Sequence, residues 1–356
     1  MANILYGVNG EGAGHSSRAH EVLKHLQASG HTVHVVSFDR GRKNLSADFE
    51  VTEIFGLRLA YAHNRVRYGR TVLRNLFTAP KAAKSLRQLQ RLAAQWCIQL
   101  VITDFEPLSC LVGHTMQLPV ISIDNQHILV CGGISYPRGY RRQAAVARMV
   151  TRLMTPRADA YLITSFFRVR LKSKNAFLFP PILRKEVLEL RPVDGDAVVV
   201  YVTSPGEELL GSLRGLRQRF ICYGFNRDGR DQNLEFKSPG REEFLKDLSA
   251  ARAVLGNAGF SLISEALHLG KPYLAWPVKG QFEQLLNAYY VEKAGYGACC
   301  QELHKEQIES FLSQLGDYRK NLAGYPREGN GALFAKLDEL MEKFAEPEIA
   351  RGPRTT

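Results

Sequence analysis

The sequence lacks several features that would assign it to other classes of protein. No uninterrupted apolar run reaches the roughly 18 residues of a membrane-spanning helix. The first residues, MANILYGVNGEGAGH, have neither the basic flank nor the long apolar core of a secretory signal. The six cysteines include no C-x-x-C pair and no histidine pattern with zinc spacing. We therefore expect a cytoplasmic protein with reduced thiols and without a structural metal.

Acidic residues are scarce in the first half of the chain. Residues 1–185 hold 26 lysines and arginines against 10 acidic residues, and residues 186–356 hold 21 against 25, so a net charge of +16 precedes one of −4. The cations concentrate in segments 58–91 and 138–157, where interleaved Leu, Val and Met predict helices. Such basic amphipathic surfaces are typical of contact with anionic lipid, acidic substrates or nucleic acid, although most charge runs are only solvated helix faces. Base-stacking aromatic platforms and base-reading motifs are not apparent, so no nucleic-acid partner is expected.

Both halves of the chain begin alike. An apolar run at 4–8 and another at 197–202 each end in a turn rich in small residues, which is typical of a buried parallel strand that leads into a helix. Further strands alternate with helices in both halves, which predicts an α/β fold with two Rossmann-like, doubly wound domains that face each other across a cleft. The expected boundaries are a first domain at 1–180, a linker at 181–196 rich in proline and charge, a second domain at 197–346 and a disordered tail at 347–356.

The first glycine-rich turn runs from Gly10 to Arg18 through Gly12, Gly14 and His15. It fails the G-x-G-x-x-G dinucleotide pattern, although Asp39 after the second strand would suit a ribose. A neutral His15 imidazole at a strand-end turn can accept the proton of an attacking hydroxyl. The alternative is a histidine whose ring only satisfies local backbone groups.

Carboxylates follow the strand predicted near residues 100–103. Asp104 could hydrogen-bond the far nitrogen of His15 and stabilise its cationic form, or Asp104 or Glu106 could itself be the base. The alternative for Asp104 is capping of the helix that begins near Pro107.

Four polar residues, Asp124, Asn125, Gln126 and His127, follow the strand predicted at 120–123. This density of hydrogen-bonding groups suits a polyhydroxylated ligand. It would equally satisfy the backbone of a buried loop.

The most specific pattern lies in the second half of the chain. After a strand that ends at Leu255 come Asn257, Gly259, Phe260 and Ser261, where a helix is expected to begin. The free N–H groups and positive dipole end of such a helix can hold a diphosphate without a metal, and no D-x-D metal motif is evident. One helical turn on, Glu265 could take both hydroxyls of a ribose. Glu283 and Gln284 open the next helix, where they could bind sugar hydroxyls.

These motifs resemble those of inverting glycosyltransferases of the two-Rossmann (GT-B) fold, the group of the muramyl-pentapeptide N-acetylglucosaminyltransferase, the galactolipid synthases and the UDP-glycosyltransferases. The second half matches in order and spacing through Gly259, Glu265, Gly270-Lys271-Pro272 and Glu283-Gln284-x-x-Asn287-Ala288. The first half is similar through its glycine turn and His15, with the departure that Ala13-Gly14 replaces a pair of glycines. The chain is also similar to uncharacterised prokaryotic glycosyltransferase-like proteins that share the D-F-E-P and D-N-Q-H strings.

The resemblance implies a role for each matching residue. In a donor domain, Glu265 would bind the ribose, Glu283 and Gln284 the donor sugar, and the backbone near Gly259, Phe260 and Ser261 the diphosphate, with Ser204 and Asn257 nearby. In an acceptor domain, His15 would be the base with Asp104 as its partner, and Gly12, Gly14 and the 124–127 loop would contact the acceptor.

The expected function is transfer of a sugar from a nucleoside-diphosphate sugar, with UDP preferred, to a hydroxyl acceptor that is lipid-linked or anionic. No cofactor is expected beyond this co-substrate. The basic half of the chain suggests peripheral binding at the inner face of a membrane. The alternatives are a sugar-nucleotide epimerase of the same fold and a non-catalytic binder of sugar nucleotides or anions.

Overall fold

The computed structural model describes residues 1–56, 61–62, 65–66, 68–203, 207–238 and 240–345, without the side chains of 61–78, 241 and 345. The chain divides into two compact units. The first contains residues 1–60, 67–184 and 328–356, and the second contains 61–66 and 185–327.

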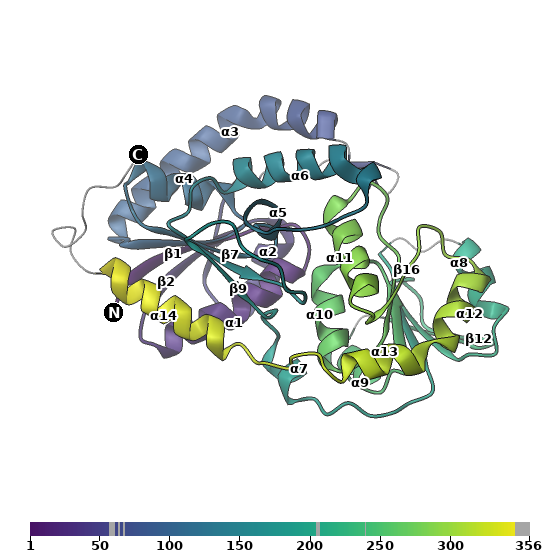
Figure 1. Cartoon of the computed structure of the whole chain (residues 1–356). Helices are drawn as coiled ribbons and strands as arrows, with labels where there is room; N and C mark the ends of the chain where they lie inside the picture. Colours follow the sequence, from purple (N-terminus) through teal and green to yellow (C-terminus); the bar gives the residue numbers. More distant parts are fainter. Residues whose placement is uncertain (57–60, 63–64, 67, 204–206, 239, 346–356) are drawn as a thin grey trace. The chain divides into compact units, whose positions relative to one another are not determined.

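The first unit is built on a seven-stranded parallel sheet in which β1 lies between β2 and β6 (Figure 1). The strand order is β3-β2-β1-β6-β7-β8-β9. The strands are β1 Asn3–Val8, β2 Thr32–Ser37, β3 Val51–Glu53, β6 Leu100–Asp104, β7 Val120–Asp124, β8 Ala160–Thr164 and β9 Ala176–Phe179. Because the chain leaves β1 for β2 and β3 and then returns to β6 on the other side, the carboxyl ends of β1 and β6 form the point where such sheets bind ligands.

Helices cover both faces of this sheet. Each sheet face has its own apolar core, one with Leu89 of α3 and Leu108 of α4, the other with Val22 of α1 and Leu337 of α14. The helical elements of the unit are α1 Gly14–Ala28, α2 Asp39–Leu45, α3 Tyr68–Gln95, α4 Pro107–Thr115, α5 Ile128–Cys131, the 3-10 turn Arg138–Tyr140, α6 Arg141–Met154 and α14 Gly331–Ala345.

Helix α14 corrects the expected domain boundaries. Its buried residues Leu333, Leu337, Leu340 and Met341 follow a helical period and pack in one cluster with β1 and α1. The expected second domain, 197–346, therefore loses its last helix to the first unit. The boundary after Arg184 falls inside the expected linker, in which Lys185–Glu189 forms α7. The tail expected to be disordered, 347–356, lies outside the described residues.

The second unit repeats the plan of the first. Its strand order is β12-β13-β11-β10-β14-β15-β16, parallel except for the β12–β13 pair. The switch point lies between β10 and β14, at the carboxyl ends of both strands. The elements are the β4–β5 hairpin (Tyr61–Ala62 and Arg65–Val66), α7, β10 Val198–Tyr201, α8 Glu207–Arg214, β11 Phe220–Tyr223, β12 Gly229–Asp231, β13 Leu234–Lys237, α9 Arg241–Ser249, β14 Ala253–Gly256, α10 Phe260–His268, β15 Tyr273–Ala275, α11 Phe282–Lys293, β16 Gly297–Cys299, α12 Lys305–Ser313 and α13 Leu315–Leu322.

Candidate functional site

The β1–α1 turn requires glycine at two positions. A Cβ on Gly10 would lie 2.1 Å from the Phe38 carbonyl oxygen, and Gly12 has a φ of +82°. Helix α1 then begins at Gly14. His15 therefore lies in the first helical turn, where the helix fixes the direction of its side chain.

The structure brings His15 and Asp104 together at the switch point of the first sheet. The His15 Nδ1 and Asp104 Oδ1 atoms are 2.6 Å apart. The Asp104 carboxylate is fully buried, whereas the His15 side chain remains 14% exposed. Because a carboxylate accepts from Nδ1–H, the lone pair of the neutral ring lies on Nε2. The ring also stacks against Phe105, at a centroid distance of 6.3 Å.

Asn9 joins the ends of β1 and β6 behind this pair. Its backbone N–H donates to the Asp104 carbonyl at 3.1 Å, and its side-chain amide donates to the Phe105 carbonyl at 3.0 Å. Phe105 has a φ of +54°, which a phenylalanine rarely adopts. These bonds stabilise the sharp turn that directs Asp104 toward α1.

Glu106 occupies a different position from the one expected of a base. Its carboxylate accepts the backbone N–H groups of Leu108, at 2.9 Å, and Ser109, at 2.7 Å, and so caps α4. The capping role considered for Asp104 therefore belongs to Glu106. Complete burial raises the pKa of Glu106, although its hydrogen bonds from Ser109 and Leu108 act in the opposite direction.

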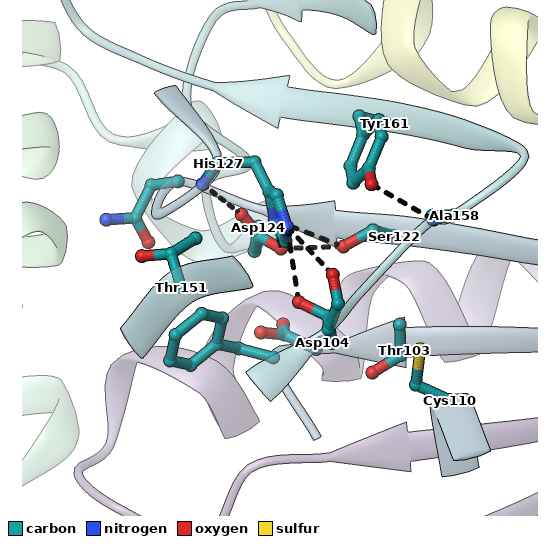
Figure 2. Close-up of polar contacts among 12 residues, drawn as sticks. Thr103, Asp104, Cys110, Ser122, Asp124, His127, Thr151, Ala158 and Tyr161 are labelled. Carbon is teal, nitrogen blue, oxygen red and sulfur yellow. Dashed lines mark hydrogen bonds and ion pairs between the residues drawn. The ribbon is translucent and has the colours of Figure 1, made fainter. Parts of the chain in front are cut away.

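A second aspartate–histidine pair lies at the end of β7, next to Asp104 (Figure 2). Asp124 Oδ2 is 2.6 Å from His127 Nδ1 and accepts from the Ser122 hydroxyl at 2.7 Å, while its Oδ1 accepts the His127 backbone N–H at 2.8 Å. Burial opposes the charged form, but the charge and hydrogen bonds of His127, together with Ser122, lower the pKa of Asp124 to about 2. Asp124 and His127 are each 1% exposed. The structure thus places these two side chains inside the loop, where they hold each other, rather than at its surface.

Arg18 is a component of the site that the sequence analysis did not assign. Its Nε donates to Asp104 Oδ2 at 2.8 Å, its Nη2 to Asp104 Oδ1 at 2.5 Å, and its Nη1 to Asn125 Oδ1 at 3.0 Å. Although burial opposes its charge, Asp104 holds the pKa of Arg18 above the ordinary value. The available signal was its spacing, because a residue three positions after His15 lies on the same face of a helix. Gln126, the remaining residue of the expected loop, is 7% exposed.

In the second unit, hydrogen bonds from neighbouring elements hold the turn between β14 and α10. The Asn257 Oδ1 atom accepts the N–H and hydroxyl of Thr203, at 2.9 and 3.0 Å, and its amide nitrogen donates to the Trp276 carbonyl at 3.2 Å. From α11, Asn287 donates to the Ala258 carbonyl at 3.0 Å. Asn257 was expected to bind a donor, but its side-chain groups join the ends of β10, β14 and β15.

Helix α10 begins at Phe260 and has no side-chain hydrogen bond at its N-cap, Gly259, so Ser261 lies in its first turn. Glu265 follows one turn later and is 7% exposed. Glu283 lies in the first turn of α11, and the neighbouring Gln284 accepts the Val278 N–H at 2.9 Å through its Oε1 atom. Ser204, expected near the diphosphate, lies outside the described residues.

No group of three or more His, Cys, Asp or Glu side chains is placed to hold a metal ion within the described residues. No helix in the described part of the chain has the length and apolar character required to cross a bilayer.

Comparison with known proteins gives matches over nearly the whole chain. The model of a family described as glycosyl transferase family 1 matches residues 2–316. A protein of Methanosarcina acetivorans described as an uncharacterized glycosyltransferase is 22% identical over 399 residues, which cover 98% of this chain and 99% of that protein.

Solved structures support the fold. LpCGTa in complex with UDP has a TM-score of 0.67 at 15% identity, covering 97% of this chain and 100% of that one. MurG of Acinetobacter baumannii has a TM-score of 0.61 at 16% identity, covering 96% and 99%. The expected fold class, two Rossmann-like domains of the GT-B type, is confirmed.

Proposed function

Because the chain belongs to glycosyl transferase family 1 and is a glycosyltransferase, we propose that it moves a sugar from a UDP-sugar to a hydroxyl acceptor with inversion at the anomeric carbon. The observation that carries this proposal is the 2.6 Å contact between His15 Nδ1 and the buried Asp104 carboxylate. That contact supplies a base and its orienting partner at the switch point of the first sheet.

A single displacement accounts for the roles of both residues. The acceptor hydroxyl gives its proton to His15 Nε2, its oxygen bonds to the anomeric carbon, and the bond from that carbon to the diphosphate oxygen breaks. Asp104 stabilises the imidazolium that forms. In this role His15 removes a proton and forms no bond to the sugar. The anomeric carbon is therefore displaced only once, and a single displacement inverts its configuration.

The donor is assigned to the second unit. The N–H groups of Phe260 and Ser261 and the positive end of α10 suit a diphosphate, with Ser204 as a further candidate. The Gly259 N–H donates to the Asn257 carbonyl at 2.8 Å, so Gly259 would contribute through the shape of the turn. Glu265 lies one turn away, where it would accept the ribose hydroxyls. Glu283 would bind the donor sugar, as would the amide nitrogen of Gln284, because the Gln284 oxygen already accepts from Val278. The structure of LpCGTa was solved in complex with UDP, so UDP is the first nucleotide to test.

The acceptor is assigned to the turn at Gly12–Gly14, beside His15. We take a lipid-linked or anionic acceptor as the first class, because the described part of the first unit has many exposed cations. On α6 the exposed arginines 141, 142 and 152 accompany Met149 and Leu153, which are 54% and 71% exposed. This surface suits peripheral binding to an anionic membrane, at the inner face where such lipids are abundant.

A panel of sugar nucleotides tests the donor assignment. Thermal stability and donor hydrolysis are measured for the wild type, Glu265→Ala and Glu309→Ala, a control at an exposed glutamate of α12. One nucleotide should raise the melting temperature of the wild type and the control but not that of Glu265→Ala. Stabilisation that survives in Glu265→Ala would contradict the donor site.

Turnover then separates the remaining alternatives. His15→Ala should bind the donor as the wild type does but lose transfer by about 100-fold or more, the scale of general-base catalysis. Conversion of the donor to its epimer without an acceptor would favour an epimerase. Equal transfer rates in His15→Ala and the wild type would overturn the assigned base.

A further inference from the structure

We propose that Arg18 is a positioning residue of the transfer reaction, which fixes the Asp104 carboxylate against His15 and limits the strength with which that carboxylate holds a proton on the His15 ring. This inference rests on the proposed role of His15 as the base. It concerns a residue that does not itself contact the reacting atoms.

Arg18 determines the orientation of the Asp104 carboxylate. The Nε and Nη2 atoms of the guanidinium bind the two oxygens of Asp104, at 2.8 and 2.5 Å. Such a planar, two-point contact fixes the plane of the carboxylate as well as its position. Oδ1 also faces His15 Nδ1, at 2.6 Å. The direction of the His15 hydrogen bond is therefore set by Arg18.

The same guanidinium anchors this arrangement to a third segment. Its Nη1 atom donates to Asn125 Oδ1 at 3.0 Å, in the loop after β7. Arg18 therefore joins α1, the end of β6 and the end of β7 through one buried side chain, which is 5% exposed. Because α1 also carries His15, the base and its partner are held on one connected set of elements.

Charge gives Arg18 its second effect. Its Nη2 atom lies 3.2 Å from His15 Nδ1. When His15 takes up a proton, its positive charge lies beside the guanidinium, and both cations share one carboxylate. A like charge at this distance disfavours the protonated ring, relative to a histidine paired with an aspartate alone. Arg18 thus places a positive charge beside the nitrogen through which Asp104 holds the His15 ring.

Other charged or titratable groups near this network do not replace Arg18. Tyr6 on β1 is buried and interacts electrostatically with both Asp104 and Arg18. Asp124 is bonded to His127, whose ring is 6.4 Å from that of Phe105. The Glu106 carboxylate is bound to the start of α4. Among the described residues, hydrogen bonds and ion pairs to the Asp104 carboxylate come only from His15 and Arg18.

The test compares Arg18→Gln, which removes the charge, with Arg18→Lys, which keeps the charge but loses the planar fork. Arg148→Gln is the matched control, because Arg148 is a part-buried arginine of the same unit that binds the Leu129 carbonyl and the Tyr136 hydroxyl. Two quantities are measured: transfer against pH, and the titration of the His15 ring by NMR of histidine-labelled protein. The NMR titration needs no substrate. A His15→Ala spectrum assigns the resonance.

We expect Arg18→Gln to lower kcat by about 10- to 100-fold, because the base is misplaced, with an unchanged KM for the donor. The acid limb of its pH–rate profile and its His15 titration should both move to higher pH than in the wild type, because the competing cation is gone. Arg18→Lys should lose a similar part of kcat but keep both titrations close to those of the wild type, because the positive charge remains. Arg148→Gln should alter neither the kcat nor the two titrations.

An unchanged His15 titration and unchanged kcat in Arg18→Gln would overturn the proposal, as would equal shifts in Arg18→Gln and Arg148→Gln. If Arg18→Gln does not fold, Arg18→Lys decides, because a kcat equal to that of the wild type would exclude a need for the fork. If His15→Ala transfers sugar as well as the wild type, the proposed function of His15 fails. The NMR comparison still decides in that case whether Arg18 sets the proton affinity of the ring.

Discussion

Each charged residue of the first site depends on a neighbour that compensates it. Arg18 and Asp104 are 5% and 0% exposed, and Asp104 is the main charge partner of Arg18. Removal of one member of a buried ion pair leaves the other without compensation, which costs more free energy than the pair itself contributes. Substitution of Asp104 therefore tests the stability of the first unit as well as catalysis.

We predict that Asp104→Asn lowers the free energy of unfolding of the first unit by about 3–5 kcal/mol, since the Arg18 charge stays buried without a carboxylate. Asp104→Leu combined with Arg18→Met should recover a large part of this loss. Unfolding in urea is followed by the fluorescence of Trp96, which stacks on His34, in a Trp276→Phe background. An unfolding midpoint of Asp104→Asn equal to that of the background would contradict the prediction.

At the scale of elements, the sequence predicted the strands at the centre of each sheet and missed those at the edges. The runs at 4–8, 120–123 and 197–202 are mostly buried and apolar, so their composition alone identifies them, and β1, β7 and β10 follow closely. Short strands such as β3, β12 and β16 lie at the edges, where hydrogen bonds to a neighbour define the strand more than composition does.

The site was predictable to the same degree. Strand-end position was sufficient to bring His15 and Asp104 together. It could not separate Asp104 from Glu106, because the direction of each side chain depends on the positive φ of the intervening Phe105. It also could not show that Asp124 and His127 bind each other. The side chains that hold the turns, such as Arg18 and Asn257, require tertiary contacts to be recognised.

At the scale of elements, we predict that the basic helix α6 binds the protein to anionic membranes. The wild type should pellet with anionic but not with neutral liposomes. Arg142→Glu combined with Arg152→Glu should weaken this binding at least tenfold, because each cation near an anionic surface contributes about 1 kcal/mol. The control reverses Lys305 and Lys320, two exposed lysines of the second unit. Equal pelleting with both kinds of liposome, or equal loss in the control, would contradict the proposal.

For the whole molecule, chain order and structural units do not coincide. Helix α14 follows the second unit in sequence but packs beside α1 of the first. The Nε2 atom of His25, on α1, lies 2.8 Å from Asp338 Oδ1, and the His25 ring stacks on Phe334 with a centroid distance of 4.3 Å. Since α1 also carries His15 and Arg18, the end of the chain supports the helix on which the proposed base depends.

We therefore predict that a chain ending at Asn330 loses the fold of its first unit while its second unit stays folded. Loss of one buried leucine side chain costs about 2–5 kcal/mol, and α14 supplies Leu333, Leu337 and Leu340, so the total is comparable with the 5–15 kcal/mol that stabilises a typical domain. Trp96 fluorescence should show no cooperative transition, whereas Trp276, in a Trp96→Phe background, should keep one. In the full-length chain, Leu337→Ala should lower the urea midpoint of the Trp96 transition without abolishing the transition. If the truncated chain keeps the Trp96 transition of the full chain, the first unit folds without α14. The first 184 residues would then form an independent domain.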